Sequence, residues 1–165
     1  MTFQSRVIVD EREKASGVPD LLEACVLQID YRLLEVGDYV VSSDSAVERK
    51  AGRDFVKSLY SGRLFDQARR LRQFYSRPVF VVEGDLQLLF SESSKPRAFW
   101  GALTSLAFQF GMSTFFTVNA GQTADLVYTL TKRTGLTKPP SGPWVQKKQR
   151  TFDTQKAQLA LVGTL

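Results

Sequence analysis

Two kinds of apolar spacing alternate along this chain, and their alternation limits the folds that it can adopt. Segments 6–12 (RVIVDER) and 78–84 (PVFVVEG) are β-branched runs typical of buried strands. From Arg53 to Tyr75 the apolar residues instead recur at helical spacing, with Gly62 separating two helices. Strands separated by amphipathic helices pack as a sheet with helices on its faces. The sequence therefore predicts an α/β fold.

Turn residues divide the rest of the chain into further elements. We expect strands over 29–36, 39–43, 46–50 and 113–119, and helices over 17–26, 96–111 and 121–135. This order predicts a meander followed by parallel crossovers, in a central mixed sheet flanked by helices in three layers. We assign residues 1–135 to this domain and the Pro-, Gly- and Lys-rich stretch 136–150 to a linker.

Composition removes several classes of enzyme. The chain has no histidine and Cys25 is its one cysteine, which excludes Ser-His and Cys-His catalysis, Cys/His zinc sites and an intrachain disulfide framework. No apolar run approaches the ~20 residues of a membrane span, and no signal-peptide pattern opens the chain. We therefore expect an intracellular, soluble protein, cytoplasmic if archaeal and nuclear if eukaryotic, whose catalysis uses carboxylates, Lys, Arg, Tyr, Ser or an oxygen-held metal.

Charge is segregated along the sequence. Residues 1–60 hold 11 acids and 8 bases, whereas residues 61–165 hold 6 acids and 14 bases. A carboxylate-rich start followed by a basic remainder suits a protein that holds a cation beside a polyanion. The alternative is charge scattered over the surface for solubility.

Residues 47–55 (VERKAGRDF) place several charges at the end of an apolar strand. If 39–43 and 46–50 form a hairpin, paired positions sum to about 86 or 87, and Asp38 lies opposite Glu48 or within one position of it. Lys50 shares their face because strand side chains alternate. Two carboxylates ~5 Å apart repel by roughly 3 kcal/mol at an effective dielectric of about 20. A positive charge should lie between them.

Two candidates can supply that charge. Lys50 itself can bridge the acids in a structural ion-pair network. Alternatively, Asp38 and Glu48 ligate a divalent cation, and Lys50 orients or helps to deprotonate a water. The second interpretation predicts metal-dependent phosphodiester cleavage.

Three motifs resemble those of a known family. VDERE, GDY and ERKAGRD resemble the V-D-x-R-E, G-D-Y and E-R-K-x-x-x-D motifs of the XPF family of structure-specific DNA endonucleases, in order and over about residues 6–135. The resemblance implies a restriction-endonuclease-like fold and the archaeal short form without a helicase. It also implies that residues 151–165 begin a truncated helix-hairpin-helix domain.

The resemblance also implies roles for individual residues. Asp38 and Glu48 correspond to metal ligands for Mg²⁺, with Mn²⁺ as a substitute, and Lys50 corresponds to the residue that activates water. Arg49 and Asp54 complete the same signature as supporting residues. The first motif contributes Asp10 near the metal, Arg12 as a phosphate contact and Glu13 without a defined role.

Each of these groups has a structural alternative. Asp10 can pair with Arg12 or cap the following helix. Arg49 can bind DNA through a phosphate or, because it lies on the opposite strand face from Glu48, form a buried pair with Asp54. A further basic group can bind DNA or form the solvated face of an amphipathic helix. Its members are Arg63, Arg69, Arg70, Arg72 and Arg77.

The segment AFWGALTSLAFQFGMSTFF holds more large apolar side chains than one helix face can bury. They are Phe99, Trp100, Leu103, Leu106, Phe108, Phe110, Phe115 and Phe116. They favour a self-interface, and the resemblance likewise implies a homodimer that engages branched or flapped DNA; a fully buried helix in a monomer is the alternative. Some relatives also bind a sliding clamp. A catalytically silent subunit that binds DNA or an active partner is the alternative function.

Overall fold

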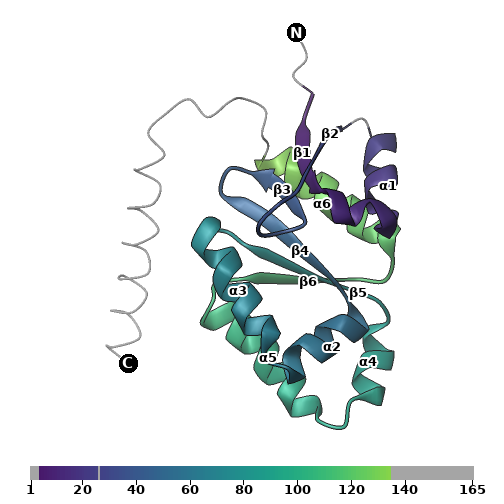
Figure 1. Cartoon of the computed structure of the whole chain (residues 1–165). Coiled ribbons are helices and arrows are strands. Elements are labelled where there is room, and N and C mark those ends of the chain that lie inside the picture. Colours follow the sequence, from purple (N-terminus) through teal and green to yellow (C-terminus); the bar gives the residue numbers. More distant parts are fainter. Residues whose placement is uncertain (1–3, 26, 135–165) are drawn as a thin grey trace.

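The computed structural model describes residues 4–25 and 27–134 (Figure 1). The predicted linker 136–150 and the segment 151–165 lie outside this range. The strands are β1 (Arg6–Asp10), β2 (Gln28–Arg32), β3 (Tyr39–Ser42), β4 (Ser45–Ala51), β5 (Val79–Glu83) and β6 (Ser113–Thr117). The helices are the 3₁₀ helix η1 (Glu11–Ser16), α1 (Val18–Ala24), α2 (Gly52–Tyr60), α3 (Arg63–Phe74), α4 (Leu86–Glu92), α5 (Pro96–Phe108) and α6 (Ala120–Thr134).

The strands form one mixed sheet in the order β2-β1-β3-β4-β5-β6. Strands β4, β5 and β6 are parallel, as the predicted crossovers require, and β3 and β4 form the predicted antiparallel hairpin. The expected three-stranded meander is wrong. Strand β2 pairs in parallel with β1, because η1 and α1 carry the chain back over the sheet between them.

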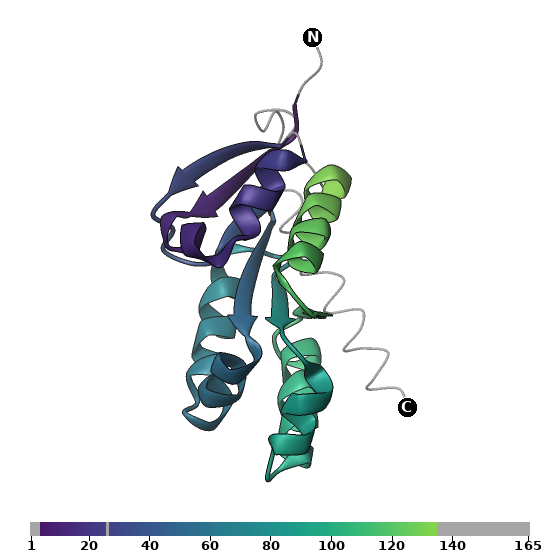
Figure 2. The same ribbon diagram turned by 90° about the vertical axis from the view of Figure 1, so that its right-hand side faces the viewer.

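Two apolar cores lie on opposite faces of the sheet. One contains buried residues of α1 and α6, such as Leu22 and Val127, packed with Val47 of β4. The other contains residues of α2 to α5, such as Phe55 and Leu106. In Figure 1, α1 and α6 lie together in the upper half and α2 to α5 in the lower half, and the turned view in Figure 2 keeps the groups apart. The predicted helices on both faces are confirmed.

Two short helices were not predicted. Strand β1 ends at Asp10 rather than at residue 12, because the Asp10 side chain accepts a hydrogen bond from the Arg12 backbone and starts η1. Helix α4 begins in the same way, where the Asp85 side chain accepts from the Leu88 backbone at 3.1 Å. Within the described residues, no helix is both long enough and apolar enough to span a membrane.

Candidate active site

The β3–β4 hairpin positions the two candidate metal ligands. Tyr39 pairs with Val47 and Val40 with Ala46, so the paired positions sum to 86 as predicted. The Asp38 backbone donates to the Val47 carbonyl at 2.8 Å, so Asp38 lies beside the Val47–Glu48 peptide, within one position of Glu48 as predicted. Gly37 directly precedes this pair with a φ of 83°, a conformation that L side chains rarely adopt.

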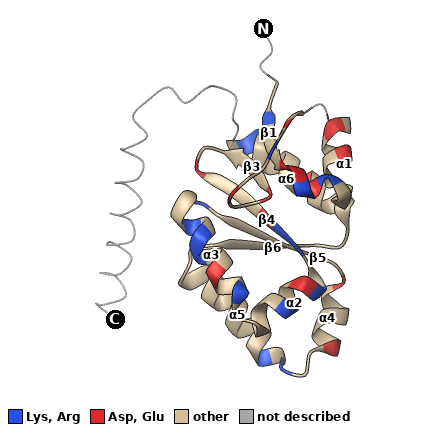
Figure 3. Ribbon diagram, in the orientation of Figure 1, with Lys and Arg blue, Asp and Glu red and all other residues tan. Residues whose placement is uncertain are grey.

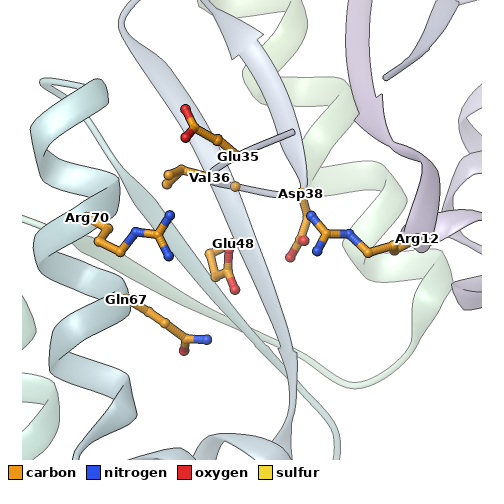
Figure 4. Close-up of a pocket in the computed structure, with 8 residues that line it drawn as sticks. Arg12, Glu35, Val36, Asp38, Glu48, Gln67 and Arg70 are labelled. Atoms are coloured by element: carbon orange, nitrogen blue, oxygen red, sulfur yellow. The ribbon is translucent and has the colours of Figure 1, made fainter. Parts of the chain in front are cut away.

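Asp38 and Glu48 line a cavity of about 210 Å³. Its other lining residues are Arg12, Glu35, Val36, Gly37, Gln67 and Arg70. In Figure 4 the two carboxylates point into the space between Arg12 on one side and Gln67 with Arg70, both from α3, on the other. The hairpin, η1 and α3 thus meet around one acidic pair, with Arg12, Arg70 and a third carboxylate, Glu35, at its rim.

The environment of this pair opposes full ionisation. Burial, followed by the charge of Glu48, raises the pKa of Asp38 from 3.8 to about 8, although its Oδ2 accepts from the Arg49 backbone at 2.8 Å. Burial also raises the pKa of Glu48, despite Lys50, whose Nζ lies 3.6 Å from Glu48 Oε1. A bound cation would lower the free energy of the doubly ionised pair.

Gln67, from α3, lines the same cavity. Its side-chain Oε1 is buried and accepts no hydrogen bond from the described protein, which is costly for a buried acceptor. The two crowded carboxylates are oxygen donors of the kind that Mg²⁺ prefers, so the residues present fit a hydrated divalent cation.

Asp10 is engaged elsewhere. Its side chain accepts from Arg12 Nε at 2.7 Å, from Arg12 Nη2 at 3.0 Å and from the Leu34 backbone at 2.8 Å. The Arg12 side-chain bond is the largest influence on the pKa of Asp10, which falls to about 2. Asp10 does not line the cavity, and the described residues hold no group of three acids or cysteines arranged for a metal. The structure thus shows the structural alternative, in which Asp10 pairs with Arg12 and caps the helix that follows. A metal role for Asp10 stays a prediction.

Arg49 lies on the opposite face of β4, as its position in the strand predicts. The structure does not form the alternative pairing with Asp54, which is exposed in the first turn of α2. Arg49 instead donates to both carboxylate oxygens of Glu83, at 2.9 and 2.7 Å, and its Nη1 lies 3.7 Å from Glu13. These hydrogen bonds raise the pKa of Arg49.

This ion pair belongs to a wider polar network beneath the hairpin. Thr123 of α6 donates to Glu83 at 2.5 Å and lies 2.7 Å from the Thr117 hydroxyl. The Tyr39 hydroxyl, whose pKa burial raises, donates to Glu13 at 2.6 Å. The network thus joins η1, β3, β4, β5, β6 and α6 behind the residues that line the cavity.

Two residues near the site, Glu83 and Gln67, were not predicted from the sequence. Glu83 ends a buried strand, and the parallel register sets it beside Ala51, directly after Lys50. A carboxylate at the end of an otherwise apolar strand was the available signal. Gln67 lies three residues before Arg70, on the same helix face, but an uncharged side chain gave no comparable signal.

The predicted arginine group divides in the structure. Arg70 lines the cavity. Arg63 donates to the Ser61 hydroxyl at 3.1 Å, and Arg69 pairs at 2.9 Å with Asp66 on the exposed face of α3. Arg77 pairs with Asp44, and Arg72 donates to the Ser76 carbonyl. Of this group, only Arg70 reaches the cavity in the described structure.

Comparison with known proteins identifies the family. The model of the ERCC4 domain matches residues 9–130, which contain the whole cavity. The chain belongs to the ERCC4-domain family. The predicted resemblance to XPF nucleases is also confirmed: this ERCC4 domain is 38% identical over 122 residues to the 3'-flap repair endonuclease Xpf of Saccharolobus solfataricus. The alignment covers 74% of this chain and 52% of that relative, so the chain spans about half the relative's length.

Solved structures support the same family and the predicted fold. The ERCC4 domain matches XPF from Aeropyrum pernix in complex with DNA, with a TM-score of 0.75 and 35% identity, over 86% of this chain and 69% of that one. The mouse DNA repair endonuclease XPF is 41% identical over 88 residues, which cover 53% of this chain and 10% of that protein.

Proposed function

We propose that this ERCC4 domain is the nuclease domain of a metal-dependent, structure-specific endonuclease. It hydrolyses a phosphodiester in branched or flapped DNA near a duplex/single-strand junction, in repair or recombination. The observation that carries the proposal is the half-buried pair Asp38 and Glu48, with Lys50 beside it, in a cavity that two arginines also line. The S. solfataricus relative is named a 3'-flap repair endonuclease, and the A. pernix XPF structure contains DNA.

Asp38 and Glu48 would hold Mg²⁺, or Mn²⁺ in its place. When bound, the ion supplies Lewis-acid polarisation of a phosphoryl oxygen. Gln67, which also lines the cavity, would offer its side-chain amide to the ion's hydration shell. The ionised forms of both acids are required for this binding.

The remaining side chains act on the substrate and on water. Lys50, next to Glu48, orients the attacking water as the phosphorus–oxygen bond to the leaving strand breaks. Arg12 and Arg70, on opposite sides of the carboxylates, bind phosphate oxygens and stabilise the additional negative charge of the transition state (Figure 4). Arg49 supports Lys50 indirectly, by tying β4 to β5 through Glu83.

A homodimer formed through α5 and β6 is part of this proposal. Of the predicted apolar surplus, Phe99 and Leu106 are buried in the core. Trp100 is 58% exposed and Phe108 88%, both on α5, and Phe115 and Phe116 are about 40% exposed on the edge strand β6. A contiguous aromatic surface beside a free strand edge favours a second copy of the chain.

The experiment is cleavage of end-labelled flap DNA with Mg²⁺, comparing the parent with Asp38→Asn and Glu48→Gln. Both variants should lose at least about 10³-fold in rate, as expected when transition-state charge stabilisation is removed. Asp66→Asn, an exposed acid on α3, is the control and should cleave like the parent. The measurement is repeated with a downstream helix-hairpin-helix module attached. If both parent forms bind flap DNA but neither cuts it, the domain is the silent subunit instead.

A further inference from the structure

A second hollow, of about 270 Å³, lies between α2 and α4, and none of the candidate catalytic or metal-binding residues lines it. Arg53, Lys57 and Tyr60 line it from α2, and Glu92 lines it from α4. Val56 and Leu89 supply apolar lining. A Cβ at Gly52 would collide with the Leu89 side chain, so the start of α2 packs closely on α4 and the groove is preformed.

The charged lining of this groove is predominantly basic. Arg53 and Lys57 are exposed, and neither forms an ion pair or a side-chain hydrogen bond with any residue that the structure describes. Their spacing of four, with Tyr60 three residues further, puts all three on one helix face. The Tyr60 side chain is 52% exposed. Two cations against one carboxylate, Glu92, leave a positive groove with an exposed aromatic ring.

The groove continues directly from the catalytic strand. Arg53 follows Lys50 by three residues, so their Cα atoms lie within about 11 Å of each other. Helix α2 covers the sheet face that carries Glu48 and Lys50, because Phe55 packs in the same core as Ala46. Figure 3 shows basic residues at the end of β4 and again on α2. A polyanion bound near the end of β4 would therefore have Arg53, in the first turn of α2, within reach.

We propose that the groove between α2 and α4 binds single-stranded DNA leaving the active site. An unpaired base stacks on Tyr60, and backbone phosphates contact Arg53 and Lys57. Arg53 and Tyr60 are seven helical positions apart, a rise of about 10 Å, which a few nucleotides of single-stranded DNA span. A single strand fits better than a duplex, since a paired base offers no free face to the ring. The proposal rests on the proposed nuclease function and adds the strand that the site engages.

The test is fluorescence anisotropy of labelled oligothymidine of about 15 nucleotides, measured with the whole chain in EDTA so that no cleavage occurs. Tyr60→Leu should weaken binding by about 10-fold, the lower part of the range for one lost stacking contact, whereas Tyr60→Phe should bind like the parent. Arg53→Gln with Lys57→Gln should reduce the slope of log K against log salt by about 1.4, because two phosphate contacts disappear. The residues are exposed, so circular dichroism should show unchanged folding.

Lys132→Gln with Arg133→Gln is the matched control, since it removes two exposed charges from one turn of α6, on the other face of the sheet. If this control changes the slope as much, binding follows net charge and the groove has no special role. Unaltered binding by Tyr60→Leu would also overturn the proposal, as would a change in oligomeric state in place of DNA affinity. Binding that behaves as expected in a parent that never cuts flap DNA would support the groove and contradict only the nuclease function.

Discussion

Arg49 and Glu83 join β4 to β5 by two hydrogen bonds between side chains, of 2.9 and 2.7 Å, on the face of the sheet opposite to the candidate metal ligands. Both side chains are largely buried, at 16% and 13% exposure. This ion pair ties to β5 the segment of β4 that carries Glu48 and Lys50. Geometry at the cavity therefore depends on contacts made behind it.

Glu83→Ala should destabilise the fold by about 2–4 kcal/mol, because it leaves the Arg49 guanidinium buried without its main partner. Urea unfolding gives the free energy. Asp66→Ala breaks the exposed pair with Arg69 and should cost less than about 1 kcal/mol. Equal losses in the two variants would mean that the Arg49–Glu83 pair contributes no more than a surface contact.

The stability of the metal-free protein should fall as pH rises from about 4 to about 8. In the folded state the pKa of Asp38 is about 8, above its ordinary 3.8, so the folded state holds more protons than the unfolded state between these values. Chemical unfolding in EDTA across this range measures the slope. Asp38→Asn should flatten it, leaving a smaller slope from Glu48, whose pKa is also raised.

The proton that Asp38 holds should compete with the metal ion for this side chain. Apparent Mg²⁺ or Mn²⁺ affinity should increase with pH and level off near pH 8, because Asp38 must ionise before it can act as a ligand. Calorimetry in buffers of different ionisation enthalpy counts the protons released. Affinity independent of pH between 5 and 8 would remove Asp38 from the ligand set.

Gln67→Leu should keep the stability of the metal-free protein but weaken the response to metal. Removing a buried acceptor without a donor should leave the metal-free protein as stable as the parent or more stable by up to about 1 kcal/mol. The stabilisation that Mn²⁺ adds should decrease. Gln73→Leu, an exposed position on the same helix, should leave the Mn²⁺-dependent increase in melting temperature unchanged. A destabilised variant with normal Mn²⁺ response would show that Gln67 serves packing alone.

Phe108→Asp should weaken self-association at least about 100-fold, since it buries a charge in the proposed interface. The residue is 88% exposed in the single chain, so monomer stability should not change. Sedimentation equilibrium measures the association. Phe74→Asp replaces another exposed aromatic residue, on α3, and should associate like the parent. A parent that stays monomeric at high concentration would reject the dimer.

The sequence predicted what is local in the chain. The hairpin register followed from alternation and turn residues, and it correctly brought Asp38 within one position of Glu48. The mistakes involve contacts between distant segments. Arg49 pairs with Glu83, 34 residues away, rather than with nearby Asp54. Strand β2 pairs with β1 although β3 is the next strand in the sequence. This pairing depends on the path of α1, which lies between β1 and β2 in the chain.

The cavity likewise combines local features that the sequence predicted with contacts between distant segments that it did not. Two carboxylates and a lysine near one hairpin were predictable from spacing, since strand geometry is regular. Gln67 and Arg70 reach the cavity only because α3 packs beside the sheet, and the rotation of a helix about its axis follows from core packing at residues such as Leu71. Sequence spacing gave the helix but not the direction in which it presents these two side chains.

The polar network beneath the hairpin has a consequence for biosynthesis. Asp38, Glu48 and Lys50 are translated early, while Glu83 and Thr123, which brace them, emerge much later. A ribosome-bound intermediate thus exposes the reactive acids before it possesses their scaffold. Under the nuclease function proposed above, the ability to cleave would therefore arise only once synthesis has passed α6.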